Sequence, residues 1–143
     1  MVEHPFSPWA GVQFAAMTQY ATHQAAESMV KARLESRGYK VSASRIPGAH
    51  FHVEHPDGCD FDVRVQGNRN QGSWWATERG REGLYFILVV VRNSRFFILN
   101  SKEWDAEVRE YRRTHNTPYT AEGFNWGQGV PYEDKWHKLP CWK

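Results

Sequence analysis

The sequence has few cysteines and no pattern among them. Cys59 and Cys141 are the two in a chain of 143 residues, and they lie far apart. Zinc sites and the disulfide frameworks of small secreted domains need several cysteines or histidines at short, regular spacings. We therefore expect no cysteine metal site and no disulfide framework, and a reducing cytoplasmic compartment is the simplest interpretation.

Long apolar segments are missing too. The longest apolar run, Leu84 to Val91, is far shorter than the roughly 20 residues of a membrane-spanning helix. The first residues, MVEHPFSPW, contain neither the basic nor the apolar region of a signal peptide. A phosphate loop, a nucleophile elbow and a zinc signature are also absent from the sequence. We expect a soluble cytoplasmic protein with no membrane partner, outside the enzyme classes that these motifs define.

Neither sign of charge dominates. The chain has 18 Lys and Arg against 16 Asp and Glu, a formal net charge of +2 and a pI near 8.6. This balance permits nucleic-acid binding without arguing strongly for it, because the basic residues are dispersed. The length favours a single domain with a substantial core.

The sequence does contain an ordered series of helical and extended patterns. They predict a helical region at 9–37 with Thr22 starting a second segment, strands at 39–46, 50–55, 59–68, 84–91 and 95–99, and a helix at 102–115 capped by Ser101. This order predicts an α+β fold with a mixed, mostly antiparallel central sheet flanked by helices. We divide the chain into an N-terminal helical extension (1–21), a core (22–116) and an aromatic C-terminal arm (117–143) packed on that core.

The best-defined element is the hairpin at residues 50–68. His55-Pro56-Asp57-Gly58 is typical of a type I turn that closes a tight hairpin. The resulting register pairs His52 with Asp62 and Glu54 with Asp60. Because side chains alternate along a strand, one face is apolar and the other carries polar groups that could act in catalysis. The polar face consists of His50, His52, Glu54, Asp60, Asp62, Arg64, Gln66 and Asn68.

This order of elements resembles the PD-(D/E)XK, or restriction-endonuclease-like, nuclease superfamily, particularly its small stand-alone bacterial and mobile-element members. The helix AAESMVKARLESRGYKV carries Glu27, and such helices often supply a metal-associated glutamate. VRVQGN resembles the third-strand motif, in which Gln or Glu, any residue and then Lys end the hairpin. The resemblance covers roughly residues 20 to 140 and implies a restriction-endonuclease-like core.

Two positions depart from the family motif. The position Ala49-His50 replaces the Asp of the first arm, and Asn68 replaces the catalytic Lys. The resemblance implies a site at Glu27, His50, Gln66 and Asn68, with the first three close to Mg²⁺ or Mn²⁺ if the protein is active. Because hard Mg²⁺ prefers carboxylate oxygen, we expect the substituted site to bind it weakly and to be catalytically degenerate.

The turn end of the polar face holds a second candidate metal or acid–base cluster, formed by His52, Glu54, Asp60 and Asp62. Asp62 lies roughly 13 Å along the strand from Gln66, at about 3.3 Å per residue, too far to share an ion. The alternative is that His52 and Asp62 form an ordinary cross-strand contact, contributing about 0.2 to 1 kcal/mol. The like-charged pair Glu54 and Asp60 favours a function, because it repels unless a cation or base lies between them.

The loop after the hairpin, NRNQGSWWATERGR, interleaves aromatic and basic residues. Arg69, Trp74, Trp75, Arg79 and Arg81 are candidates for contacting nucleic acid, with tryptophans on bases and arginines on phosphates. In a chain with seven tryptophans, packing in the core is an equally strong alternative.

Three hypotheses follow, of which we prefer the first. In the first, the protein has a nuclease-like fold and binds nucleic acid, with DNA as the expected partner, but does not cleave it. Such a protein would act in DNA processing, mobile-element or defence functions. The second is an active Mg- or Mn-dependent endonuclease with a migrated site. The third is an inhibitor or immunity module that presents its aromatic arm to a protein partner. A homodimer is compatible with each of them.

Overall fold

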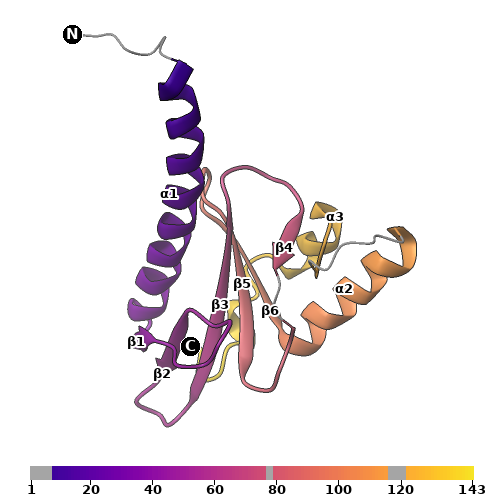
Figure 1. The fold of residues 1–143 in the computed structure, drawn as a ribbon. Coiled ribbons are helices and arrows are strands. Elements are labelled where there is room, and N and C mark those ends of the chain that lie inside the picture. The colour runs from indigo at the N-terminus through magenta and orange to yellow at the C-terminus, as the bar shows by residue number, and fades with distance from the viewer. Residues whose placement is uncertain (1–7, 77–78, 116–121) are drawn as a thin grey trace, which may run out of the picture.

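The computed structural model of the chain describes residues 8–76, 79–115 and 122–143, with side chains from residue 19 onward. The helices and strands are α1 (Pro8–Glu35), β1 (Lys40–Ala43), β2 (Phe51–Glu54), β3 (Asp60–Asn68), β4 (Trp74–Ala76), β5 (Leu84–Val90), β6 (Arg95–Asn100), α2 (Ser101–His115), β7 (Glu122–Phe124) and α3 (Trp126–Gly129) (Figure 1). Two 3-10 turns follow, Val130–Tyr132 and Trp136–Lys138. Parts of the predicted N-terminal extension (1–7) and of the predicted arm (117–121) lie outside the described residues.

A mixed sheet of five strands forms the centre of the fold, in the order β1-β2-β3-β5-β6. The pairing of β3 with β5 is parallel and the other pairings are antiparallel. The prediction of an α+β fold with a mostly antiparallel sheet is therefore confirmed. A small second sheet joins β4 to β7, which the sequence did not predict.

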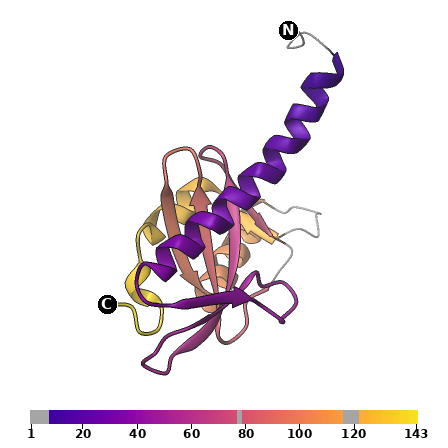
Figure 2. The same cartoon turned by 90° about the vertical axis from the view of Figure 1, so that its left-hand side faces the viewer.

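Helix α1 covers one face of the sheet, and its N-terminal end extends beyond it (Figure 2). Ala26, Val30 and Leu34 are fully buried at helical spacing against the sheet. A β-carbon at Gly67 of β3 would lie 2.6 Å from the Ala26 Cβ, so only glycine lets the helix approach this closely. The helix is continuous through Thr22, and the predicted second segment starting there is wrong.

The opposite face of the sheet packs against α2, β4 and β7. Its core includes Trp74, Phe86, Trp104 and Phe124, all fully buried. Strand β5 contributes side chains to the cores on both faces, as its continuous apolar sequence predicts. Helix α2 is capped by a reciprocal pair of hydrogen bonds between Asn100 and Glu103, and Asn100 takes the capping role predicted for Ser101.

The hairpin has the predicted register. His52 pairs with Asp62 and Glu54 pairs with Asp60. Gly58, at φ +99°, closes the turn in a conformation that other residues rarely adopt. The apolar face of the hairpin is buried in the core beneath α1, which leaves its polar face on the side of β4 and α2.

A disulfide ties the C-terminal segment to the hairpin. Cys59 beside the turn is bonded to Cys141, with their Cα atoms 6.1 Å apart. The expectation of no disulfide framework is therefore wrong, because the fold brings together two cysteines that are remote in sequence. Trp136 and Leu139 of the same segment are buried in the core beneath α1, so the disulfide closes a segment that is already packed.

Candidate strand-edge site

The structure brings Glu27, His50 and Gln66 together at one pocket, which we call the strand-edge pocket. They come from α1, from the loop before β2 and from β3. The pocket has a volume of about 320 Å³, and its lining residues are His23, Glu27, His50, Arg64, Val65, Gln66, Trp75 and Ala76. Three of the four predicted catalytic positions thus meet, although they are separated in sequence.

The pocket exists because β3 is longer than its neighbour. Strand β2 pairs with β3 as far as Val63, and in the described part of the chain no strand pairs with the same edge of β3 beyond it. Helix α1 lies on one face of this free edge and β4 on the other. His23 and Glu27, one helical turn apart, therefore line the pocket from one side, and Trp75 lines it from the other.

His50 covers part of the exposed strand edge. Its Nδ1 accepts a hydrogen bond from the Val65 backbone N–H at 2.9 Å, in the place where a neighbouring strand would supply a carbonyl. Arg64 donates from Nη1 to the Gly48 carbonyl at 3.2 Å, which holds the same loop against β3.

The donor atoms of the pocket do not fit a standard Mg²⁺ or Mn²⁺ site. Among its lining residues Glu27 supplies the one carboxylate, beside the Gln66 side-chain amide and the imidazoles. Within residues 8–76, 79–115 and 122–143, no group of three or more His, Cys, Asp or Glu is placed to hold a metal ion. Hard divalent cations need several oxygen ligands at short distance, and the residues that line this pocket do not supply them.

Asn68, the fourth predicted catalytic residue, does not line the pocket. Its Nδ2 donates to the Ser73 carbonyl at 3.0 Å and so closes the loop that leads from β3 to β4. In the structure this side chain therefore contacts the backbone of the loop and not the pocket.

The second predicted cluster forms a separate group near the hairpin turn. His52 lies between two aspartates, with Nδ1 at 3.2 Å from Asp62 Oδ1 and Nε2 at 3.7 Å from Asp60 Oδ2. Ser44 also donates to Asp62 Oδ1 at 2.9 Å. The buried Asp62 is therefore satisfied by protein groups. With Glu54 the group borders a cavity of about 510 Å³, but the four residues are not placed to bind a metal.

The predicted nucleic-acid-binding residues divide into buried and exposed members. Trp74 is fully buried in the core, stacked at 6.3 Å on Trp126, so its predicted contact with nucleic acid is wrong. Trp75 is 38% exposed, and Arg79 lies on the surface at 3.1 Å from the Glu122 carboxylate. Alternation along β4 turns one tryptophan inward and the next outward.

The two remaining arginines of the predicted binding loop lie apart from Trp75. Arg81 donates from Nη2 to the Pro47 carbonyl, and its backbone N–H donates to Ser101 Oγ at 2.9 Å. Arg69 borders a different hollow, which it shares with Arg92 between α1 and the end of β5. The predicted loop is therefore not one continuous binding surface.

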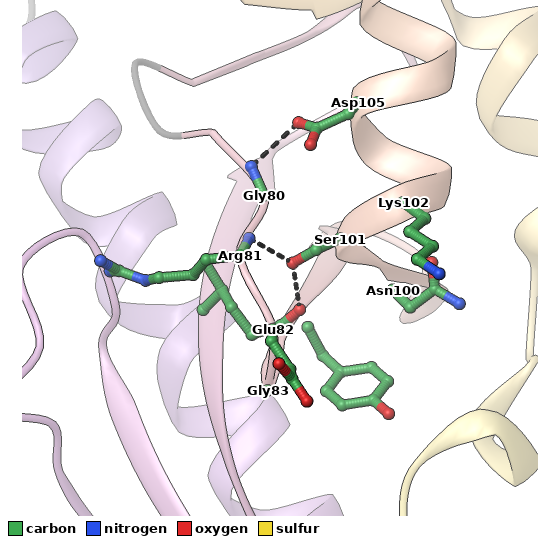
Figure 3. A pocket seen from close by; sticks show the side chains of 10 residues that line it. Gly80, Arg81, Glu82, Gly83, Asn100, Ser101, Lys102 and Asp105 are labelled. Atoms are coloured by element: carbon green, nitrogen blue, oxygen red, sulfur yellow. Dashed lines mark hydrogen bonds between the residues drawn. The ribbon is translucent and has the colours of Figure 1, made fainter.

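A larger cavity, of about 600 Å³, lies where residues 80–83 meet the start of α2 (Figure 3). Ser101 Oγ donates to the Leu84 carbonyl at 2.6 Å, and Asp105 accepts from the Gly80 N–H at 2.9 Å. These hydrogen bonds hold the loop before β5. The sequence did not predict this cavity, because the contacts join segments that are about 20 residues apart.

Sequence reasoning also missed His23 as a pocket residue. Its spacing of four from Glu27 was a usable signal, because residues four apart share one side of a helix. Tyr111 of α2, which lies near Trp75, had no such signal, because its position depends on how α2 packs against β7.

Comparison with protein-family models, curated proteins and solved structures gives no match. The resemblance to the PD-(D/E)XK nucleases therefore stays a prediction from the residues themselves. In the described residues, no helix has the length and apolar character needed to cross a membrane.

Proposed function

We propose that this protein binds nucleic acid, with DNA as its partner, at the strand-edge pocket and does not cleave it. The observation that carries the proposal is the meeting of Glu27, His50 and Gln66, from three separate segments, at one open pocket. A polar pocket at an uncovered strand edge offers donors to a ligand without disturbing the core.

The charges around the pocket favour a polyanion. Arg64 and Glu27 line the pocket with opposite formal charges, so the excess of positive charge comes from residues outside the pocket lining. Arg79 and Arg112 both pair with the buried Glu122 of β7, the strand that pairs with β4, and leave one unneutralised positive charge there. Phosphate contacts of this kind supply most of the affinity of nucleic-acid-binding proteins and make that affinity sensitive to salt.

A metal-dependent endonuclease is the second candidate, and the same meeting of Glu27, His50 and Gln66 favours it. The donor set argues against it, because one carboxylate and one amide oxygen are a weak pair for Mg²⁺ or Mn²⁺. The inhibitor hypothesis has less support. It needs an arm that displays its aromatic side chains, whereas Trp136 is 6% exposed and stacks on Trp142.

The proposal places the protein and its DNA partner in the cytoplasm, where disulfides are usually reduced. The proposal therefore requires that the fold persist when Cys59 and Cys141 are thiols. The buried contacts of Trp136 and Leu139 support this, because they do not depend on the covalent bond.

Titrations of fluorescently labelled DNA, single-stranded and duplex, test the proposal. We expect the anisotropy to rise on binding and the affinity to fall as salt is raised from about 50 to 200 mM, with a logarithmic slope of about 0.7 to 0.9 per phosphate contacted. Supercoiled plasmid incubated with Mn²⁺ should remain intact. Failure to bind either form of DNA at low salt would refute the proposal, and cleavage that is lost in Gln66→Ala would establish the endonuclease instead.

A further inference from the structure

Trp75 stands out as an exposed tryptophan in a strand whose other two residues are buried. It is 38% exposed, whereas Trp74 and Ala76 on either side are 0% and 6% exposed. Trp75 also lines the strand-edge pocket, so its exposed surface continues into the site proposed above.

The indole of Trp75 is held in place by its neighbours. It lies over Gly123 of β7, where a β-carbon would come within 2.5 Å of Trp75 Cε3. Tyr111 of α2 meets the indole edge to face, with ring centroids 5.5 Å apart and planes at 87°. Tyr111 in turn stacks on His115 at 4.0 Å. We call Trp75, Tyr111 and His115 the aromatic shelf.

Two arginines lie beside the aromatic shelf and share one carboxylate. Arg79 and Arg112 each place Nη2 at 3.1 Å from the same oxygen of Glu122. The Glu122 side chain is only 7% exposed, whereas those of Arg79 and Arg112 are 76% and 42% exposed. Two guanidinium groups against one buried carboxylate leave a net positive charge at the surface, at the β7 residue next to Gly123, which pairs with Trp75.

We propose that the aromatic shelf binds unpaired bases, so that the preferred ligand is a single-stranded nucleic acid. This inference rests on the proposed function and narrows its ligand. A base stacks on Trp75 while the phosphates beside it lie near Arg79 and Arg112. The preference follows because stacking needs an exposed base face, which a continuous duplex keeps inside its own stack.

The test compares a labelled single-stranded DNA of mixed sequence with the duplex made from the same strand. We expect wild type to bind the single strand more tightly. Trp75→Ala should weaken single-strand binding by roughly 5- to 150-fold, the range measured for loss of one stacked base, and change duplex binding by less than about twofold. Trp75→Phe, which keeps an aromatic ring, should restore most of the single-strand affinity.

Tyr20→Ala is the matched control, because Tyr20 is an exposed aromatic residue, 65% exposed, that lies on α1 and belongs neither to the aromatic shelf nor to the pocket lining. It should bind both probes as wild type does. If thermal melting shows that Trp75→Ala does not fold, Trp75→Leu takes its place, because leucine keeps apolar volume without a ring.

Tighter binding of the duplex by wild type would overturn the inference, and so would an equal loss of affinity for both probes in the folded variant. Either result would leave the proposed function standing. Binding of neither probe would overturn both.

Discussion

Gly67 sets how closely α1 approaches β3, and with it the position of His23 and Glu27 at the pocket. A methyl group there would meet Ala26 Cβ at 2.6 Å and the Thr22 carbonyl at 3.3 Å. We expect Gly67→Ala to lower the free energy of unfolding by about 1 to 3 kcal/mol, because α1 must shift outward. Urea denaturation measures this change. Gly72→Ala, where a β-carbon meets nothing closer than 3.9 Å, is the control, and equal stability of the two variants would contradict the packing described here.

Tyr39 gives the fold a dependence on alkaline pH. Its hydroxyl donates to the Pro140 carbonyl at 2.6 Å, and burial raises its pKa from 10.0 to about 12. The unfolded chain therefore ionises first, and the free energy of unfolding contributed by Tyr39 falls as pH rises from 10 to 12. Below pH 10 the contribution is fully present. We expect the free energy of unfolding, measured by urea denaturation, to fall less for Tyr39→Phe than for wild type between pH 9 and pH 11. Identical losses would contradict the raised pKa of Tyr39.

At the scale of elements, the C-terminal segment is fixed to the hairpin by one covalent bond and several weaker contacts. Besides the disulfide, Lys143 Nζ lies 2.8 Å from Asp57 Oδ2, and Arg37 donates to the Lys143 carbonyl at 2.6 Å. Closing a loop across 82 residues restricts the unfolded chain strongly. The disulfide should therefore matter more to stability than the exposed ion pair.

We expect reduction to lower the free energy of unfolding by about 2 to 4 kcal/mol while the protein stays folded. Urea denaturation with and without reductant measures the difference. A variant with both Cys59→Ser and Cys141→Ser serves as the control. Its free energy of unfolding should equal that of the reduced protein and should not change when reductant is added. A wild-type midpoint that reductant does not move would show that the disulfide adds nothing.

The elements that the sequence predicted best are those whose structure is determined by residues close together in the chain. The turn His55–Gly58 fixes the register of β2 with β3, and the unbroken apolar run identifies β5. Strands β4 and β7 have three residues each and pair across a long stretch of chain, so no local pattern could reveal them. The same applies to the disulfide, whose partners meet only in the finished fold.

The candidate site was predictable in part for the same reason. Glu27, His50 and Gln66 were grouped by resemblance, and the pocket collects them. Asn68 lies outside the pocket lining, and the sequence could not reveal this because its hydrogen bond to Ser73 depends on the path of the loop. Trp74 and Trp75 are adjacent, and only the pairing of β4 with β7 decides which of them faces the core.

At the scale of the whole molecule, the sheet separates two cores, and the pocket lies where the sheet is incomplete. Helix α1 closes one core, while α2 and the small β4–β7 sheet close the other. The free edge of β3 between these layers carries the polar groups that the cores exclude. We interpret this opening as the nucleic-acid site of the proposed function, because Glu27 supplies the one carboxylate among its lining residues and a divalent metal ion requires more.

The affinity of single-stranded DNA for Glu27→Gln, measured with a metal chelator present, tests this account most directly. If Glu27 faces phosphate rather than a metal, removing its charge should strengthen binding by roughly 2- to 5-fold, as expected for one partly screened repulsion. Glu35→Gln, at the far end of the same helix, should leave the affinity unchanged. Unchanged or weaker binding by Glu27→Gln, together with Mn²⁺-dependent cleavage by wild type that this variant lacks, would contradict the account.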